Sequence, residues 1–395
     1  MINSVCGIRS TGRMCTDLAA ALEEKGHEVR IAYGREIVPK EYQKYAIRIG
    51  SDVDTNLHGL QARLFDASGF GSKRATKKFI EWVKEYDPDV IHLHNLHGYY
   101  INIEILFDYL RMCGRRIIWT LHDCWAFTGH SAYCDAVDCN RWKTGCYNCP
   151  LARDYPASYS DNSKSNWERK RQNLTGVPDM TVVTPSVWLA DLTRESFLAD
   201  YPITVIHNGI DTNLFHPMKS SFRENARIEN KIVLLGVASS WNDMKGLSDF
   251  IYLSENMDQK FQMILVGLSK TQKKKCPSNI IVIEKTNNLK ELACIYSAAD
   301  IFLNLSYCEN YPTVNLEALA CGTPVLTYDV GGSKESALNY AKYAVKRGSI
   351  KSIRENIDLI LRDIEKEQLI VDIDKIDSSR TVDKYVDLYE RTDKQ

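Results

Sequence analysis

The sequence predicts an α/β protein made of two doubly wound domains with parallel sheets. Short apolar runs alternate with amphipathic helical segments, and this alternation restarts near residue 231. The chain has 395 residues, which is too many for one ordinary core and suits two domains. We therefore expect one domain over residues 1–214, a second over 215–378, and a helical C-terminal segment over 379–395.

The composition is that of a soluble globular protein, with 44% hydrophobic and 26% charged residues. The net charge of −1 gives no case for nucleic-acid binding. No run is apolar and long enough to span a bilayer, and the N-terminus has no signal-peptide pattern. We therefore expect a cytoplasmic protein, in which the twelve cysteines are reduced or bound to metal.

The first domain opens with a strand, a glycine turn, a helix and a second strand. They are expected at residues 1–6, 7–13, 14–25 and 28–33. This order is the opening of a nucleotide-binding fold, with the turn at the carboxyl edge of the sheet. Residues 35–70 are expected to be irregular.

A basic amphipathic helix is predicted over residues 73–86. Its cations are Lys73, Arg74, Lys77, Lys78 and Lys84. They could form an ordinary solvated face. Alternatively, they could dock on an anionic membrane surface, because clustered cations are attracted to acidic headgroups.

Histidines follow the next two buried strands. His92, His94 and His97 have the composition of a metal triad, but only His92 and His94 share a strand face, and His97 lies beyond the strand end. A metal is therefore the less favoured interpretation. The strand at 117–121 ends in His122, which is either a candidate site residue or a histidine satisfied at a strand end.

A cysteine-rich loop occupies residues 124–150. Its cysteines are Cys134, Cys139, Cys146 and Cys149. In a reducing compartment, such a cluster with a Cys-x2-Cys closure favours a structural four-thiolate zinc site, for which His130 is a substitute ligand. The alternatives are two disulfides or free thiols. A closed site of this kind leaves no open coordination position and so predicts no catalytic role.

The remaining elements continue the alternation up to the stretch at 306–335. Further helices are expected at 167–174, 186–192, 247–255 and 289–298, and strands at 180–185, 203–206, 231–238, 261–266, 280–283 and 300–305. Lys245 lies just before the helix at 247–255, where its charge suits a diphosphate.

The stretch at 306–335 reads as loop, helix, turn, strand and glycine loop. Pro312 can occupy a first helical position, and Gly322 ends the helix. Glu309 precedes the helix and Glu317 lies within it, with seven residues between them. A helix N-terminus suits a phosphate, and carboxylates accept hydrogen bonds from sugar hydroxyls. Without its context, such a pair of glutamates would more often be solvated charges.

This ordered context resembles the donor-binding element of the retaining glycosyltransferases of family 4, which have the GT-B fold. The resemblance covers most of the chain, including the strand from Asp89 to His94 and the turn at 207–217. It implies two Rossmann-like domains that face each other across a cleft, with the segment 379–395 crossing back onto the first domain.

The resemblance also implies the roles of individual residues. His122, Glu309 and Lys245 are the catalytic candidates, with His122 near the reacting sugar. The implied donor-binding residues are Gly12, Arg13, Lys245, Glu284, Asn310, Tyr311, Pro312, Thr313 and Glu317. The family usually has an arginine shortly before the lysine, but Ser239, Ser240 and Trp241 stand there in this chain. Phosphate binding is therefore expected to depend on Lys245 and helix N-termini.

The implied activity is transfer of a sugar from a nucleotide diphosphate sugar to a saccharide or lipid-linked saccharide in polysaccharide biosynthesis, with retention of configuration. No cofactor is expected for catalysis, and no nucleic acid is expected as a partner. A peripheral position at the inner face of the membrane would suit a lipid-linked acceptor. Two alternatives stay open: a sugar-nucleotide epimerase of the same fold, and a non-catalytic sugar-nucleotide-binding subunit of a polysaccharide assembly complex.

Overall fold

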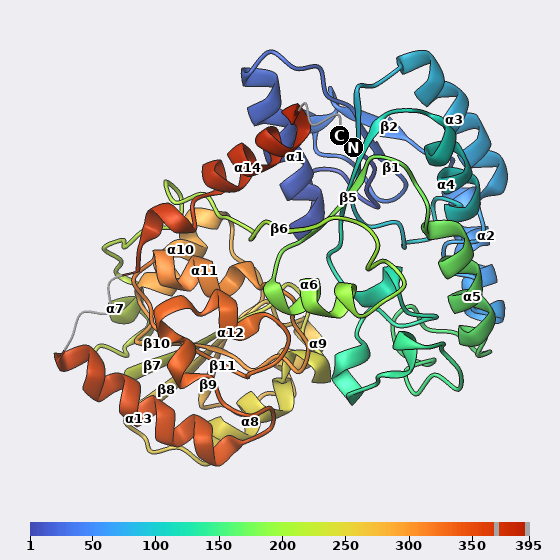
Figure 1. Cartoon of the computed structure of the whole chain (residues 1–395). Helices are drawn as coiled ribbons and strands as arrows, with labels where there is room; N and C mark the ends of the chain where they lie inside the picture. The colour runs from blue at the N-terminus through green and yellow to red at the C-terminus, as the bar shows by residue number, and fades with distance from the viewer. Residues whose placement is uncertain (367–370, 392–395) are drawn as a thin grey trace. The chain divides into compact units, whose positions relative to one another are not determined.

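The computed structural model describes residues 1–366 and 371–391, which form two compact units (Figure 1). The first unit is Met1–Ile206 together with the chain from Val382, and the second is His207–Thr381. The chain passes from the first unit to the second between Ile206 and His207, which is earlier than the boundary at 214/215 expected from the sequence. The reason is that Asn208 donates to the carbonyl of Tyr311 at 3.1 Å, and Ile210 pairs with Asp377.

The first unit contains a parallel sheet. Its strands are β1 (Ile31–Tyr33), β2 (Ala46–Arg48), β3 (Val90–Leu93), β4 (Arg116–Thr120), β5 (Met180–Thr184) and β6 (Ile203–Val205). The pairing order is β1-β2 and β3-β4-β5-β6, and Ile2 bridges both Ala32 of β1 and Leu93 of β3. The first strand expected at residues 1–6 is therefore reduced to isolated bridges at Ile2, which lies between β1 and β3.

Helices α1 to α6 belong to this unit. They are α1 (Arg9–Glu24), α2 (Asp52–Phe65), α3 (Lys73–Tyr86), α4 (Ile103–Met112), α5 (Ser163–Leu174) and α6 (Val187–Arg194). Helix α1 begins five residues before the expected start at residue 14. Gly12 and Arg13 therefore lie in a helix and not in a turn, and the turn falls at Gly7, where φ is +71°.

The prediction that residues 35–70 are irregular is wrong, because β2 and α2 occupy much of this stretch. Helix α2 begins with a capping box. The Asp54 N–H donates to the Ser51 hydroxyl at 3.3 Å, and the Ser51 N–H donates to the Asp54 carboxylate at 2.9 Å. These bonds satisfy two of the N–H groups that a helix start leaves unpaired.

The last helix, α14 (Ser378–Glu390), ends against the first unit. Tyr385 and Thr120 share a hydrogen bond of 3.0 Å between their hydroxyl groups, and the Tyr389 hydroxyl lies 2.6 Å from Nδ1 of His92. These two contacts tie α14 to strands β3 and β4, and Tyr385, Thr120 and His92 are all buried there.

The second unit contains a five-stranded parallel sheet of order β11-β10-β7-β8-β9. The strands are β7 (Ile232–Val237), β8 (Phe261–Val266), β9 (Ile280–Ile283), β10 (Ile301–Asn304) and β11 (Val325–Thr327). The helices are α7 (Phe222–Ala226), α8 (Leu247–Glu255), α9 (Lys270–Lys273), α10 (Leu289–Ser297), α11 (Thr313–Ala320), α12 (Ser333–Ser336) and α13 (Ile350–Lys366).

The strand order places a topological switch point in each unit. In the second unit, β8 and β9 lie on one side of β7, and β10 and β11 lie on the other. In the first unit, Ile2 has β1 on one side and β3 on the other. Open α/β sheets bind ligands in the crevice that such a reversal leaves at the carboxyl ends of the strands. We therefore expect ligand sites at the loops that follow β7, β10, Ile2 and β3.

Within the described ranges, no helix combines the length and the apolar character needed to cross a membrane.

Candidate active site

Lys245 and Glu309 meet at the switch point of the second unit. Lys245 ends the 3-10 turn Asp243–Lys245, which follows β7, and Glu309 lies in the loop that follows β10. The Lys245 ammonium and the Glu309 carboxylate form an ion pair. The two loops are also joined by the Tyr307 N–H, which donates to the Met244 carbonyl at 2.8 Å. The fold therefore brings together two candidates that are 64 residues apart in the chain.

Gly246 allows this close approach of the two loops. Its φ is +71°, and a Cβ there would lie 2.1 Å from the carbonyl oxygen of Leu305. A side chain would collide with backbone, and an L-residue would also be strained at this φ. The glycine after Lys245 is thus required for the junction between the start of α8 and the end of β10.

Glu317 is buried in α11, where only 8% of the residue is exposed. Its Oε2 accepts a hydrogen bond of 3.0 Å from the hydroxyl of Tyr296. Burial raises the pKa of Tyr296 well above its ordinary value, and the charge of Glu317 raises this pKa further. The phenol therefore stays a donor, and the structure excludes the alternative in which Glu317 is a freely solvated helix charge.

The start of α11 differs slightly from the expectation. The helix begins at Thr313, so Pro312 is the residue before it and not its first helical residue. Tyr311 is buried, and its ring stacks on His207 with centroids 4.7 Å apart. The Tyr311 side chain is therefore occupied by packing, while Asn310 and Thr313 are half-buried.

Two buried asparagines that the sequence reading did not single out hold α11 in place. The Asn304 side chain donates to the Asn315 side-chain oxygen at 2.9 Å, and the Asn315 amide donates to the Ser336 hydroxyl at 2.8 Å. These bonds join β10, α11 and α12, because one asparagine ends β10 and the other lies inside α11. A polar amide among apolar neighbours in both segments was the available signal, since buried polar groups need partners.

Three further donor candidates are Glu284 in the second unit and Gly12 and Arg13 in the first. Glu284 follows β9, which β8 separates from β7, and its carboxylate lies 3.3 Å from the ammonium of Lys273. Gly12 is buried in α1, and a Cβ there would meet the Val5 side chain at 3.0 Å. Arg13 is exposed. The close approach at Gly12 is thus to the chain itself, and its donor role stays a prediction.

Histidines and an aspartate cluster where β3 and β4 end in the first unit. Nδ1 of His94 lies 3.1 Å from Nε2 of His122, and Nε2 of His97 lies 2.8 Å from the Asp123 carboxylate. The other ring nitrogen of His97 lies 3.1 Å from the Tyr155 hydroxyl. Burial lowers the pKa of His122 to about 4, so this ring is neutral at pH 7.

The three-histidine metal site that the sequence left open is not formed. Both ring nitrogens of His92 lie within hydrogen-bond distance of other side chains, at 2.8 Å from Thr120 and 2.6 Å from Tyr389. Across residues 1–366 and 371–391, no group of three or more His, Cys, Asp or Glu side chains is arranged to hold a metal ion. This finding also applies to the four cysteines Cys134, Cys139, Cys146 and Cys149. In the part of the chain that the structure describes, none of the twelve cysteines forms a disulfide bond, which excludes the two-disulfide alternative.

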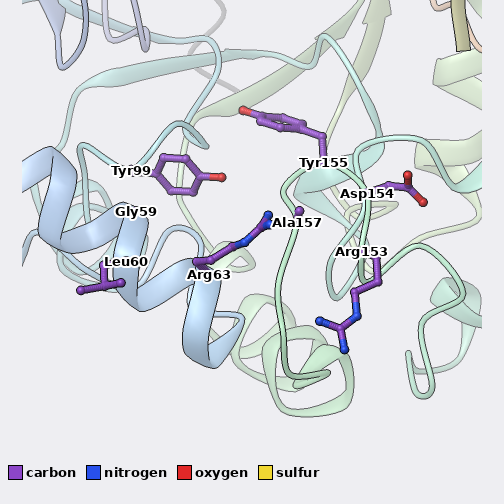
Figure 2. Close-up of a pocket in the computed structure, with 8 residues that line it drawn as sticks. All are labelled: Gly59, Leu60, Arg63, Tyr99, Arg153, Asp154, Tyr155 and Ala157. Carbon is purple, nitrogen blue, oxygen red and sulfur yellow. The ribbon is translucent and has the colours of Figure 1, made fainter. Parts of the chain in front are cut away.

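A cavity of about 560 Å³ lies beside the histidine cluster and was not predicted (Figure 2). It is lined by Gly59, Leu60, Arg63, Tyr99, Arg153, Asp154, Tyr155 and Ala157. Figure 2 shows Arg63 reaching from α2 toward the loop that carries Ala157. Tyr155 links the cavity to the cluster, because its hydroxyl contacts His97. Guanidinium groups beside phenol rings suit a phosphate attached to a larger group.

Comparisons with known proteins agree with the two-unit α/β fold. The family model described as Glycosyltransferase Family 4 matches residues 11–214, and the model described as Glycosyl transferases group 1 matches residues 218–372.

Two curated relatives are similar in sequence. WcaC from Escherichia coli (strain K12), whose name describes a colanic acid biosynthesis glycosyl transferase, is 26% identical over 69% of this chain and 67% of its own length. N,N'-diacetylbacillosaminyl-diphospho-undecaprenol alpha-1,3-N-acetylgalactosaminyltransferase from Campylobacter jejuni is 28% identical over 51% of this chain. This second match spans 58% of the Campylobacter protein.

Solved structures match over almost the whole chain. Sucrose-phosphate synthase from Thermosynechococcus elongatus has a TM-score of 0.71 at 16% identity and covers 98% of this chain and 97% of its own. HepE from Anabaena, solved in complex with UDP, has a TM-score of 0.64 at 15% identity and covers 98% of each chain. At these identities the likeness establishes the fold alone.

Proposed function

Because the chain belongs to Glycosyltransferase Family 4 and has the GT-B fold, we propose that it transfers a sugar from a nucleotide diphosphate sugar to a lipid-linked saccharide, with retention of anomeric configuration. The glycosyltransferase class follows from the family. The donor, the acceptor and the stereochemistry are the proposal. The observation that carries it is the Lys245–Glu309 pair at the switch point of the second unit.

The pair suits a donor that has both negative charge and hydroxyl groups. A diphosphate attracts the Lys245 ammonium, and the Glu309 carboxylate then accepts hydrogen bonds from the sugar. The leaving diphosphate gains negative charge in the transition state, where Lys245 and helix N-termini stabilise it. HepE has been solved with UDP and with UDP-glucose, which makes uridine nucleotides the first donors to test.

The cavity of the first unit suits the charged part of a lipid-linked acceptor. Arg63 and Arg153 line it. The positive charge of Arg35 also acts on Tyr99 and Tyr155, because it lowers the pKa of both phenols against the effect of burial. Cations collected around aromatic rings can hold a diphosphate and the sugar next to it. The name of the Campylobacter relative includes a diphospho-undecaprenol acceptor, which is consistent with this assignment.

An exposed apolar stripe continues from the cavity along α2. The stripe consists of Val53, Leu57, Leu60 and Leu64, which are 66%, 57%, 54% and 41% exposed, and Leu60 also lines the cavity. The spacing of three to four residues places these side chains on one helix face. An apolar face that begins at a cationic cavity matches a molecule with a phosphate head and a hydrocarbon tail.

His122 is proposed to contact the reacting sugar as a neutral group. Its low pKa keeps the ring uncharged, so it can exchange hydrogen bonds with hydroxyls without adding a second positive charge. The same-face attack assisted by the leaving phosphate is what the family implies for this step.

The test is incubation with a panel of nucleotide sugars, first alone and then with a lipid-diphosphate saccharide. A new glycolipid that forms only in the second mixture, with the anomeric configuration of the donor by NMR, is the expected result. Epimerised donor without acceptor would identify an epimerase instead. Donor binding without conversion in either mixture would identify a binding subunit.

A further inference from the structure

The cysteine-rich loop contains three half-buried thiols and a buried imidazole nitrogen that has no hydrogen-bond partner among the described residues. The His130 side chain is 0% exposed, and its Nδ1 lies 2.5 Å from the carboxylate of Asp66. A carboxylate only accepts, so Nδ1 carries the proton and Nε2 keeps its lone pair. Among the described residues, Nε2 has no hydrogen-bond partner. A buried lone pair without a donor is costly, which indicates that something else occupies it.

Hydrogen bonds connect Cys146 and Cys149 to the surroundings of His130. The N–H of Gly129, the neighbour of His130, donates to Sγ of Cys146 at 3.2 Å. The Cys149 N–H donates to the Asp161 carboxylate at 2.7 Å, and His130 lies within electrostatic range of the same aspartate.

Cys139 belongs to the same group, and Cys134 does not. Cys139 and Cys149 are both within electrostatic range of Cys146. Cys134 is only 5% exposed and packs in the hydrophobic core of the first unit. Cys134 therefore differs from the other three cysteines in its burial, since Cys139, Cys146 and Cys149 are only half-buried.

We propose that this loop binds one structural Zn²⁺ through Nε2 of His130 and the thiolates of Cys139, Cys146 and Cys149, with Cys134 as a core thiol. Three thiolates and one imidazole form a complete tetrahedral set. A histidine ligand whose other nitrogen donates to a carboxylate is the usual outer-shell arrangement, which assigns Asp66 as the orienting partner. These side chains are not in a ready coordination geometry, so metal binding must draw them inward.

A cationic side chain close to Cys146 complements the negative charge that such a zinc centre would carry. Zn²⁺ with three thiolates carries a net charge of −1, and the charge of Lys170 lies within range of Cys146. The Lys170 ammonium is buried and donates to the carbonyls of Trp125 and Thr128, at 2.6 Å and 3.0 Å, so it is held beside the loop. A buried cation of this kind offsets the charge of the metal centre.

The proposed zinc site would also stabilise the segment that lines one side of the cavity. Cys149 is followed closely by Arg153 and Tyr155, which line the cavity. In the described residues the loop has only short 3-10 turns, Cys124–Ala126, Cys134–Val137 and Arg141–Lys143. Such a segment has few backbone bonds of its own, and a metal would stabilise it.

The experiment measures zinc in the purified full chain from zinc-supplied cultures after dialysis. About one zinc per chain is expected in the native sequence. Cys134→Ser is the matched control and should keep this zinc, whereas Cys146→Ser and His130→Gln should bind zinc about tenfold or more weakly. Absence of zinc from the native chain overturns the site. Loss of zinc in Cys134→Ser, or full retention in folded His130→Gln, overturns this set of ligands.

The variant His130→Cys distinguishes the loss of a ligand from the loss of the fold. His130→Cys supplies a fourth thiolate, so it should retain zinc, and its cobalt(II) form should absorb about one third more strongly in the sulfur-to-metal charge-transfer region than native cobalt protein. An unchanged cobalt spectrum would mean that residue 130 is not a ligand. These readouts do not depend on sugar transfer, so they fail or succeed separately from the proposed function.

Discussion

Lys245 and Glu309 are partners in one ion pair, so the proposed donor would affect both residues. An ammonium that is 37% exposed and a carboxylate that is 14% exposed compensate each other's charge. In the proposed function, a diphosphate competes with Glu309 for Lys245, and the released carboxylate becomes available to the sugar. Substituting either residue therefore also removes the partner of the other.

Lys245→Ala should weaken donor binding and slow turnover. One charge-assisted contact to phosphate is lost, which corresponds to about 1.5–3 kcal/mol. Donor affinity by calorimetry and kcat/KM measure the effect. Lys351→Ala is the control, because Lys351 is 88% exposed and its pair with Glu355 lies on α13. Unchanged donor affinity and rate in Lys245→Ala would show that another cation holds the diphosphate.

The two glutamates should separate into different kinetic roles. Glu309→Gln should lower mainly kcat, because hydrogen bonds that strengthen as the sugar becomes cationic lose the charge they depend on. Glu317→Gln should raise mainly the donor KM, through weaker contacts to the ribose.

Tyr296→Phe is the control for Glu317, since it removes the phenol that holds the carboxylate and leaves the charge. It should lower the free energy of unfolding by about 1 kcal/mol and leave kcat near normal. Normal kcat and KM in both glutamate variants would contradict the donor-site assignment.

For individual residues, the sequence identifies those in local motifs. It does not identify residues whose contacts form only in the folded chain. Glu309, Glu317 and Lys245 stand in recognisable local patterns. Tyr296 and Asn304 become relevant only when strand pairing brings them next to α11, and no local pattern records that.

Helix α2 shows why one element was missed. Its buried residues are only His58 and Ala62, while its leucines face outward. Hydrophobic periodicity marks the buried face of a helix, so an inverted helix gives a misleading signal. The capping box at Ser51 was the remaining clue, with Asp54 in the place usually taken by glutamate or glutamine.

His58 of α2 should make stability depend on pH. Its Nε2 accepts the N–H groups of Gly69 and Gly71, at 3.2 Å and 3.1 Å, so the folded ring must be neutral. Burial lowers its pKa from 6.5 to about 4. The unfolded chain therefore takes up this proton first. The contribution of His58 to the free energy of unfolding is complete above pH 6.5 and is lost progressively as the pH falls from 6.5 to 4. The total loss is about 3 kcal/mol.

Urea titrations of the native chain and of His58→Gln between about pH 7.5 and about pH 3 test this, because these limits lie about one unit outside the two pKa values. The native curve should fall more steeply with decreasing pH than that of the variant. His27→Gln is the control, since this histidine side chain is 46% exposed. Parallel curves for native protein and His58→Gln would show that His58 titrates as an ordinary histidine.

At the level of the whole molecule, the alternation of elements predicted the α/β class and most strands. The second unit agrees well, because most residues of its parallel strands are apolar. The first unit agrees less well, since Ile2 has only isolated bridges and β2 has no fully buried residue. The cavity could not be predicted, because Arg63 and Tyr155 come from segments about 90 residues apart and meet only in the folded chain.

The last prediction concerns the surface formed by α2 and α3. The cations of α3 predicted from the sequence, Lys73, Arg74, Lys77, Lys78 and Lys84, are all exposed. Helices α2 and α3 are joined at the start of α3, where His58 contacts the Ser72 hydroxyl at 2.9 Å. The basic face should respond to the charge of a membrane and the apolar stripe to its hydrocarbon.

Co-sedimentation with vesicles separates these two contributions. Binding should require anionic lipid and weaken with salt, because charges at a surface are screened. Lys73→Glu with Lys77→Glu should abolish the salt-sensitive part, and Leu57→Ser with Leu64→Ser should weaken the part that persists at high salt. Lys351→Ala, on the second unit, should change neither. Equal binding to neutral vesicles, or binding to neither kind, would contradict an electrostatic membrane contact. The lipid-linked acceptor would then have to reach the cavity without help from the α3 cations.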